Sequence, residues 1–203
     1  SRANRSRRLK HEIFRRVGNT QENLTIDSPY FVMTDYTMKL FSSVLAKEVS
    51  TTLLTNGVYS SDNGPDSSVF NHYVEDWVSR GLKVTIFGGK REKGAEFLIN
   101  GVNKSRWGTH SKTFVFDNDS TMIGTYNLDP RSANYSFEIS VFCDDSSELA
   151  SAVRQNVYER QELGISFKTK EEARKHAMDN VPMLKRIMNY AIRPFSLIIQ
   201  GLL

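Results

Sequence analysis

The sequence predicts a mixed α/β fold in which a largely parallel central sheet carries helices on both faces. Between residues 24 and 87, short apolar runs typical of strands alternate with segments of helical periodicity, the order that builds βαβ units. The 203 residues are enough for one domain with appendages. Hydrophobic residues make up 39% and charged residues 25% of the chain, a globular balance that excludes disorder, collagen and coiled-coil arrays as the main architecture.

The N-terminal half supplies the alternating elements. Leu9, Ile13, Phe14 and Val17 recur at helical spacing, and Gly18 follows as a helix stop. Further along, short apolar runs indicate strands, and apolar residues three or four apart indicate helices. In order, we expect a helix over 7–17, a strand over 24–27, a helix over 36–49, a strand over 51–55, a polar loop over 60–68, a helix over 69–78 and a buried strand over 82–87.

The C-terminal half opens with a long loop and then places three strand candidates in quick succession. Asn118-Asp119-Ser120 is a turn sequence that joins the first two of these strands. We expect the loop over 88–109, the strands over 110–117, 121–126 and 137–143, a helix over 147–161 and a helical tail over 170–192. The predicted units are a basic amphipathic helix or linker over 1–19, a main domain over 20–165 and a helical amphipathic tail over 166–203.

Basic residues gather at the start of the chain. Residues 1–16 have a net charge of +6, whereas the whole chain is +4, so the remaining 187 residues are slightly acidic, at about −2. This arm can contact phosphates or an anionic membrane surface, or it can form a solvated helix face, and the sequence leaves both readings open. No apolar run reaches the ~20 residues of a membrane-spanning helix. The single cysteine, Cys143, excludes an internal disulfide framework and a cysteine-based zinc cage.

His110 and Lys112 are the first candidates for chemistry. Side chains alternate between the two faces of a strand, so residues two apart point the same way. An imidazole beside an ammonium group at the open end of a strand suits a phosphate group. The lysine supplies positive charge, and the histidine supplies a nitrogen that can attack phosphorus or move a proton.

Residues on the following strands extend this pattern. Asn127 can donate its amide N–H to a phosphoryl oxygen, and Glu138 can bond one ring nitrogen of His110, which fixes the tautomer and leaves the other nitrogen free. Gly124 allows a close backbone approach. Each residue alone has an ordinary structural explanation, such as a surface charge or a turn former. Together they form a spaced pattern over the 29 residues from 110 to 138, which makes those explanations unsatisfactory.

These residues form a motif that resembles that of the phospholipase D superfamily. The resemblance rests on H-x-K-x4-D at 110–117, G-T-x-N at 124–127 and N-x-D-P-R-S at 127–132. In addition, Ser28-Pro29-Tyr30-Phe31 resembles the entry to the second catalytic half of bacterial cardiolipin synthases. The similarity extends over about residues 20–160, so the main domain is expected to be a phospholipase D-like catalytic domain.

The resemblance implies a role for each matching residue. His110 would form a phosphohistidine intermediate or act as the general acid. Lys112 and Asn127 would bind the phosphate group, and Glu138 would orient the histidine. Asp117 would complete the catalytic motif in a mainly structural role.

Four more residues are candidates for contact with the substrate: Thr125, Ser132, Lys90 and Trp107. Neither a metal ion nor a cofactor is expected. In the family, two lysines neutralise the phosphate charge in place of a metal ion, and Lys112 supplies one of them.

The chain departs from the family in carrying one H-x-K motif, whereas a phospholipase D site uses two that face each other. His11, His72 and His176 lack the residues of a second motif. Two explanations stay open: a single-motif protein that forms a homodimer, or the C-terminal half of a two-motif enzyme. The S-P-Y-F match and the start at Ser1 favour the second. In both cases an isolated monomer is expected to be nearly inactive.

Three functions compete. We favour phosphodiester transfer or hydrolysis through a phosphohistidine, with a phosphatidyl group passing between phospholipids or to an alcohol, as in a cardiolipin synthase. The alternative is a metal-independent endonuclease that acts as a homodimer, in which the basic loop 90–106 would follow a phosphate backbone, although the body of the chain is slightly acidic. The third is a non-catalytic dimerising or regulatory module, against which the intact motif argues.

The expected partners are a phospholipid substrate and a second H-x-K half, either a homodimer mate or a missing N-terminal half. Nucleic acid is a less favoured partner. The tail mixes basic and apolar residues, so it can lie in a membrane interface or pack on the domain. We expect a bacterial protein that is peripheral to the inner membrane or cytoplasmic.

Overall fold

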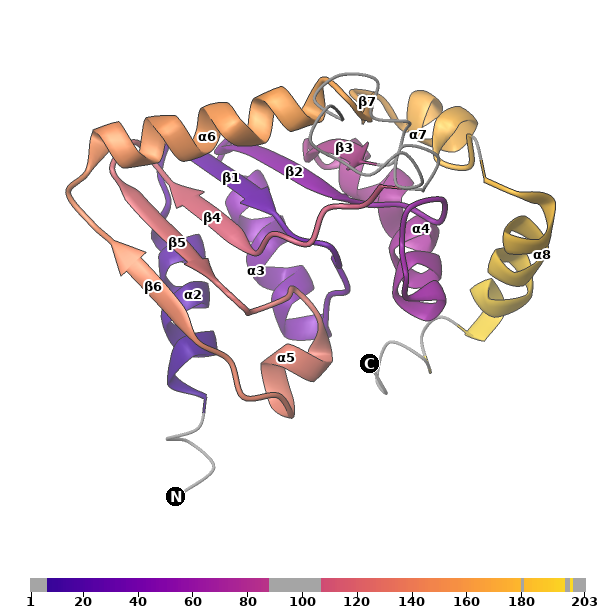
Figure 1. Ribbon diagram of the computed structural model, residues 1–203, viewed down its shortest axis with the longest axis horizontal. Helices are drawn as coiled ribbons and strands as arrows, with labels where there is room; N and C mark the ends of the chain where they lie inside the picture. The colour runs from indigo at the N-terminus through magenta and orange to yellow at the C-terminus, as the bar shows by residue number, and fades with distance from the viewer. Residues whose placement is uncertain (1–6, 88–106, 180, 196–197, 199–203) are drawn as a thin grey trace, which may run out of the picture.

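The computed structural model describes residues 7–87, 107–179, 181–195 and 198. Within these residues, seven strands form one sheet in the order β6-β5-β4-β1-β2-β3-β7 (Figure 1). The strands are β1 Asn23–Asp27, β2 Ser50–Asn56, β3 Lys83–Phe87, β4 Thr113–Phe116, β5 Ser120–Gly124, β6 Ser140–Cys143 and β7 Ile165–Phe167.

The sheet is mixed, as expected, but it is not largely parallel. The pairs β1–β2 and β2–β3 are parallel, and the pairs β1–β4, β4–β5, β5–β6 and β3–β7 are antiparallel. The physical reason lies in the connections. Helical crossovers join only the first three strands in parallel, whereas short turns join β4 to β5 and so impose antiparallel pairing.

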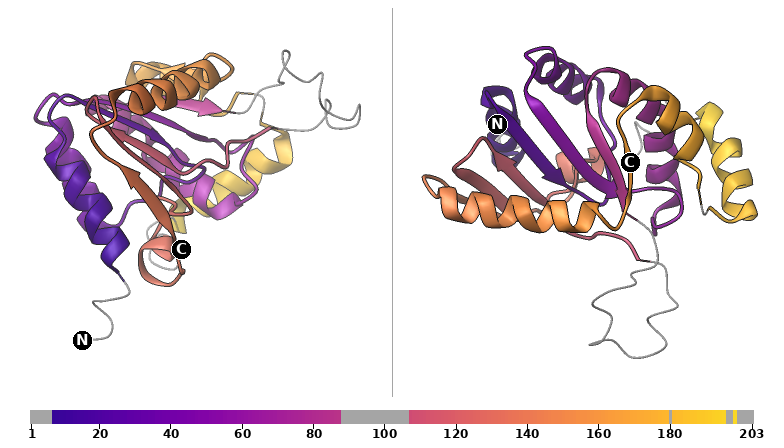
Figure 2. Two further views of the ribbon diagram at one scale, coloured as in Figure 1. Left: turned by 60° about the vertical axis from the view of Figure 1, so that its left-hand side comes forward. Right: turned by 90° about the horizontal axis from the view of Figure 1, so that it is seen from above.

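Helices cover both faces of the sheet, which confirms that part of the prediction. Helix α6 lies along one face, and α2, α3 and α4 lie on the other (Figure 2, right). Helices α7 and α8 pack beside α4. The helices are α2 Arg8–Asn19, α3 Asp35–Leu45, α4 Gly64–Ser79, α5 Pro130–Asn134, α6 Ser147–Gln161, α7 Lys170–His176 and α8 Met183–Ile192, and a 3-10 turn, Arg193–Phe195, follows α8. None of the described helices is long and apolar enough to cross a membrane.

The main core lies between the sheet and the helices α2, α3 and α4. Helix α2 buries Ile13, Phe14 and Val17 in it, because these residues share one face of the helix. Phe31 packs edge-on against Phe41 of α3, with 5.6 Å between ring centroids. The segment that we expected as a separate basic helix or linker is therefore anchored in the main core.

Helix α4 begins inside the segment that we expected to be a loop over 60–68. Asn63 caps the helix, because its side chain accepts the backbone N–H of Asp66 at 3.4 Å, and Pro65 fits the first turn. The first turn is polar, so apolar periodicity became visible only at Val69. Because residues 64–68 were predicted to be a loop and not the start of a helix, the sequence analysis did not consider Asp66 as a site residue.

Other boundaries also differ from those expected. The helix predicted over 36–49 ends at Leu45, and Glu48 then adopts a positive φ of 62°. The short elements α5 and β7 were missed, because five and three residues are too few to show a period. The expected tail helix divides into α7 and α8, and the expected boundary after residue 165 falls inside β7.

Candidate active site

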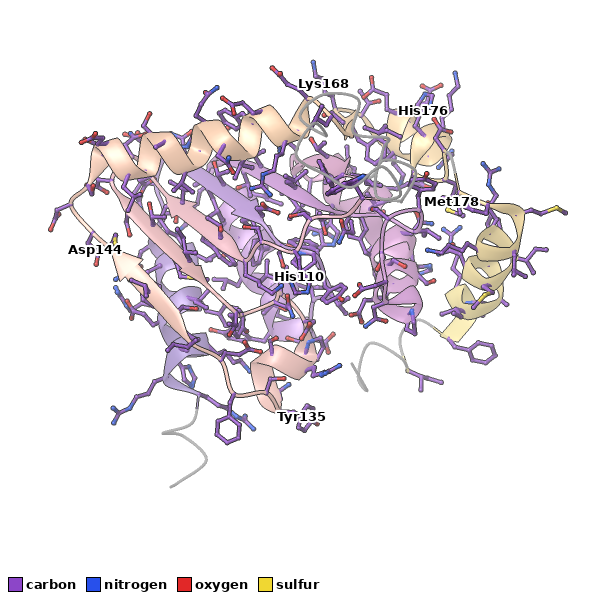
Figure 3. The ribbon with its side chains drawn as sticks, viewed as in Figure 1. His110, Tyr135, Asp144, Lys168, His176 and Met178 are labelled. Atoms are coloured by element: carbon purple, nitrogen blue, oxygen red, sulfur yellow. The ribbon has the colours of Figure 1, made fainter. Side chains whose placement is uncertain are left out.

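His110 and Lys112 lie directly before β4, not inside it as the sequence predicted. β4 runs antiparallel to β1, so Thr113 pairs with Asp27 at the carboxyl end of β1. Figure 3 shows His110 at this end of β4. In open α/β sheets, ligands bind outside the carboxyl ends of the parallel strands. Both residues therefore lie at the edge of the sheet where a ligand is expected.

Lys112 is buried and contacts His110 twice. Its Nζ donates a hydrogen bond to Nδ1 of His110 at 2.9 Å and another to the His110 carbonyl oxygen at 2.7 Å. Lys112 is 7% exposed, whereas His110 is exposed. Burial lowers the pKa of Lys112, and the nearby carboxylate of Glu138 acts in the opposite direction. The structure thus places a shielded ammonium group behind an accessible imidazole.

The contact with Lys112 distinguishes the two ring nitrogens of His110. An ammonium group only donates, so Nδ1 accepts, and a neutral imidazole then carries its proton on Nε2. In this state Nε2 can donate a proton. It can attack phosphorus only after the proton has moved to Nδ1. If a bound phosphate group accepts the hydrogen bond from the ammonium of Lys112, Nδ1 is no longer an acceptor for Lys112 and can carry the proton.

Asn56, at the end of β2, fixes the segment that leads into the site. Its Nδ2 donates to the carbonyl oxygen of Thr109 at 2.8 Å, and its Oδ1 accepts the Thr109 N–H at 2.8 Å. The hydroxyl of Thr109 donates to buried Asp27 at 2.7 Å, and Asp27 also pairs with Arg160 of α6. Burial raises the pKa of Asp27, and Arg160 opposes this. The sequence analysis missed this support, because its members come from distant segments.

Glu138 is held by two hydroxyl groups. Thr125 Oγ1 donates to its carboxylate, and Ser132 Oγ donates to the other carboxylate oxygen at 2.8 Å. Ser132 Oγ also accepts the backbone N–H of Asn127 at 3.3 Å. Among the described residues, no hydrogen bond joins Glu138 to His110, so the expected orienting contact is not formed here. Thr125 and Ser132, which we expected at the substrate, both position Glu138.

One cavity brings four of the predicted site residues together. It has a volume of about 270 Å³ and is lined by His110, Asn127, Ser132 and Glu138. The lining residues that the sequence analysis had not assigned to the site are Tyr30, Asn63, Asp66, Asp129, Arg131 and Ser136. Tyr30, Asp129 and Arg131 belong to the motifs quoted above, so the motifs could have indicated them.

The charges around this cavity are of both signs. Burial raises the pKa of Asp129, whose side chain accepts the backbone N–H of Ser132 at 2.6 Å at the start of α5. Arg131 acts in the opposite direction on that carboxyl group. In the described part of the chain, no group of three or more His, Cys, Asp or Glu side chains is arranged to hold a metal ion.

Asp117 lies at the other end of β4, away from the cavity. Its carboxylate accepts backbone N–H groups of Gln21, Glu22 and Asn23 at 3.0, 2.7 and 3.2 Å. The bonds tie the start of β1 to the end of β4. Asp117 therefore has a structural position in the motif and does not line the site.

Three further expectations have different outcomes. Trp107 packs against Leu54, Phe87 and Val157 beneath α6 and does not line the cavity. Lys90 lies outside the described residues. A Cβ at Gly124 would lie 2.1 Å from Ser140 Oγ and 2.4 Å from the carbonyl oxygen of Ile139, so this glycine allows the expected close backbone approach, here by the segment that enters β6.

A mixed sheet covered on both faces, with a histidine–lysine pair at the edge of a polar cavity, defines a phospholipase D-like domain. The chain belongs to the family described as the phospholipase D-like domain of cardiolipin synthase, which matches residues 13–160. It is 26% identical over 160 residues to cardiolipin synthase C of Escherichia coli K12, covering 78% of this chain and 34% of that protein.

Two solved structures share the fold. Phosphatidylserine synthase of Haemophilus influenzae matches 96% of this chain and 45% of its own chain, with a TM-score of 0.69 and 15% identity. Nuc of Salmonella typhimurium, a phospholipase D family member, matches 79% of this chain and 91% of its own, with a TM-score of 0.60 and 14% identity. The chain spans only part of the length of the curated relatives that it matches: 26% of one and 34% of cardiolipin synthase C.

Proposed function

We propose that this chain supplies one half of a site that transfers or hydrolyses phosphodiesters through a phosphohistidine. A phosphatidyl group would move from one phospholipid to another or to an alcohol. The observation that carries the proposal is the His110–Lys112 pair, with Nζ 2.9 Å from Nδ1 at a cavity that Asn127 also lines. Membership of the cardiolipin synthase domain family supports the choice of a lipid substrate.

The reaction proceeds in two displacements. Lys112 and Asn127 bind the non-bridging oxygens, which stabilises the charge that develops on the phosphoryl group. A histidine nitrogen forms a bond to phosphorus while the P–O bond to the leaving alcohol breaks, and the histidine of the opposing half gives that oxygen a proton. The acceptor hydroxyl then attacks phosphorus and gives its proton to the second histidine, the one that had protonated the leaving oxygen. The N–P bond to the first histidine breaks. His110 fills one of these two roles.

An exposed apolar surface beside the site supports the requirement for a second half. Phe137, Ile139 and Val141 alternate along edge strand β6 and the segment that leads into it, and they are 102%, 73% and 65% exposed. Ile123, which pairs with Val141 across β5 and β6, is also exposed. Apolar surface of this kind next to a site marks an interface. We infer that the second H-x-K half, from a homodimer mate or from a longer chain, covers it.

Helix α8 supports contact with a membrane surface. It turns polar residues toward the domain, where Asn189 donates to Ser68 at 3.0 Å and Lys185 donates to the carbonyl oxygen of Ser61 at 3.1 Å. Its exposed residues are Met183, Leu184, Ile187, Met188 and Tyr190. An outward apolar face on a short helix is what an interfacial helix presents to lipid. We therefore propose a peripheral location at the membrane that holds the substrate.

The function is tested with the intact protein and phosphatidylglycerol in mixed micelles that contain deuterium-labelled glycerol, so that transfer to glycerol gives a labelled product. We expect phosphatidyl transfer products, with phosphatidic acid as the product of competing hydrolysis, both identified by mass spectrometry. With a phospholipid labelled at phosphorus, an alkaline quench should trap an acid-labile label on histidine, on His110 or on its counterpart in the second half. An absence of lipid turnover contradicts the proposal.

The endonuclease alternative is tested in the same preparation. Binding to nucleic acid through phosphate contacts weakens steeply as salt rises. Cleavage of plasmid DNA without added metal, faster than lipid turnover and lost with salt, would replace the lipid proposal. The slightly acidic charge of the chain beyond residue 16 is the reason that this function ranks second.

A further inference from the structure

We infer that Asp66 binds the hydroxyl group of the alcohol that accepts the phosphatidyl group. Asp66 lies in the first turn of α4, is 3% exposed and lines the same cavity as His110 and Asn127. The inference rests on the proposed function, because that function places an alcohol oxygen beside the phosphorus atom. It adds a residue that selects the acceptor to those that hold the phosphate group.

The carboxyl group of Asp66 has one oxygen engaged and one free. Asn63 Nδ2 donates to Oδ2 at 2.6 Å, whereas Oδ1 is buried and has no hydrogen-bond partner among the described residues. Native structures rarely leave a buried oxygen unpaired, because its lost hydration is not replaced. Oδ1 of Asn127, another residue of this cavity, is also buried and has no partner in the part of the chain that the structure describes. A ligand that reaches both residues would satisfy both atoms.

Other polar groups of the cavity are already engaged. The hydroxyl of Tyr30 donates to Asp62 at 2.7 Å, and the carboxylate of Glu138 accepts from Thr125 and Ser132. Asp66 therefore has an oxygen available to a ligand, whereas the side chains of Tyr30 and Glu138 already form hydrogen bonds within the protein.

The surrounding charges favour a hydroxyl group over an anion. Burial and the neighbouring Asp129 raise the pKa of Asp66 to about 7, and Arg131 opposes them. An anionic group would be repelled by the two carboxyl groups. Near neutral pH, a partly protonated carboxyl group both donates and accepts hydrogen bonds, which matches a hydroxyl group.

The test compares transfer with hydrolysis in a single reaction. The intact protein converts phosphatidylglycerol at several concentrations of deuterium-labelled glycerol, and formation of labelled phosphatidylglycerol, the product of transfer to glycerol, is measured beside release of phosphatidic acid. In Asp66→Ala we expect the KM for glycerol to rise at least fivefold, while hydrolysis stays within twofold of wild type. Asp66→Asn should restore most of the transfer, because the amide keeps an oxygen and an N–H.

The control is Asp76→Asn, which makes the same charge change on α4 at a side chain that is 62% exposed. It should leave the ratio of transfer to hydrolysis unchanged. Circular dichroism checks folding, and Asp66→Ser replaces the alanine variant if that variant unfolds.

Each other outcome is decisive. Equal losses of transfer and hydrolysis in Asp66→Ala, or an unchanged ratio, overturn the inference while the proposed function stands. A larger loss with ethanolamine than with glycerol points to an ammonium ligand and also overturns it. If the wild-type protein turns over no lipid, the proposed function fails and the inference falls with it.

Discussion

Lys112 combines a charge with burial at the candidate site. Its ammonium group has lost most of its hydration, and within the described ranges it donates hydrogen bonds to two atoms of His110. A buried cation of this kind destabilises a fold unless an anion accompanies it. The carboxylates of Glu138 and Asp27 offset part of this cost, and a bound phosphate group would offset more of it, so the arrangement favours binding more than stability.

We therefore predict that Lys112→Met loses activity without losing stability. Methionine keeps an unbranched apolar stem and removes the charge. Turnover should fall about 100-fold or more, whereas the midpoint of thermal unfolding should stay equal or rise. Steady-state kinetics and scanning calorimetry measure the two effects. Lys39→Met, at an exposed lysine of α3, is the control and should change neither. Full activity in Lys112→Met would contradict the assignment.

Local spacing made part of the site predictable. His110 and Lys112 are two residues apart, so an extended segment places them side by side whether or not it belongs to the strand. The neighbours of Glu138 were not predictable in this way, because they depend on how α5 folds back onto the segment before β6. Asp66 was also missed, because it comes from a helix whose polar first turn lacks a period.

At the level of elements, Arg16 ties α2 to the edge of the sheet. Its guanidinium donates to Ser120 at 2.7 Å, to Asp144 at 2.9 Å and to Glu12 at 2.7 Å, and it stacks on Phe142 at 4.5 Å from the ring centroid. The bond to Arg16 lowers the pKa of Asp144 to about 2. Arg16 is thus bonded within the domain. At this position the basic arm therefore has a structural role, in preference to contact with phosphates or a membrane surface.

Removal of this tie should loosen α2. Arg16→Met keeps part of the packing and deletes the charged hydrogen bonds. We expect the free energy of unfolding to fall by about 1–2 kcal/mol, after allowing for solvent screening of the exposed Asp144. Urea unfolding measures the change. Arg15→Met is the matched control, since Arg15 is exposed and pairs only with Glu12 among the described residues. Equal losses in both variants would refute the role of Arg16.

Sequence patterns were sufficient to predict the boundaries of several helices and strands. The helix α6 matches its predicted range of 147–161, and β1, β2 and β3 match within about a residue, because long periods and buried runs define them. The sheet's balance of parallel and antiparallel pairs was not predictable from those runs. It depends on where β4 and β7 insert beside β1 and β3, because each of these pairs joins strands that are distant in sequence.

At the scale of the whole molecule, the site is open on one side. The cavity lies beside an exposed apolar edge that includes Phe137 and Ile139. The chain's single H-x-K motif and this exposed edge lead to the same proposal, that a second half completes the site.

The central claim is that His110 takes part in the reaction, either as nucleophile or as acid. The most direct test is the lipid turnover of His110→Ala in the intact protein, beside His176→Ala, whose imidazole is 39% exposed and bonds only Asp179 among the described residues. We predict that His110→Ala loses at least about 1,000-fold in turnover with an unchanged fold, and that His176→Ala keeps wild-type activity. Full turnover in His110→Ala would contradict the account.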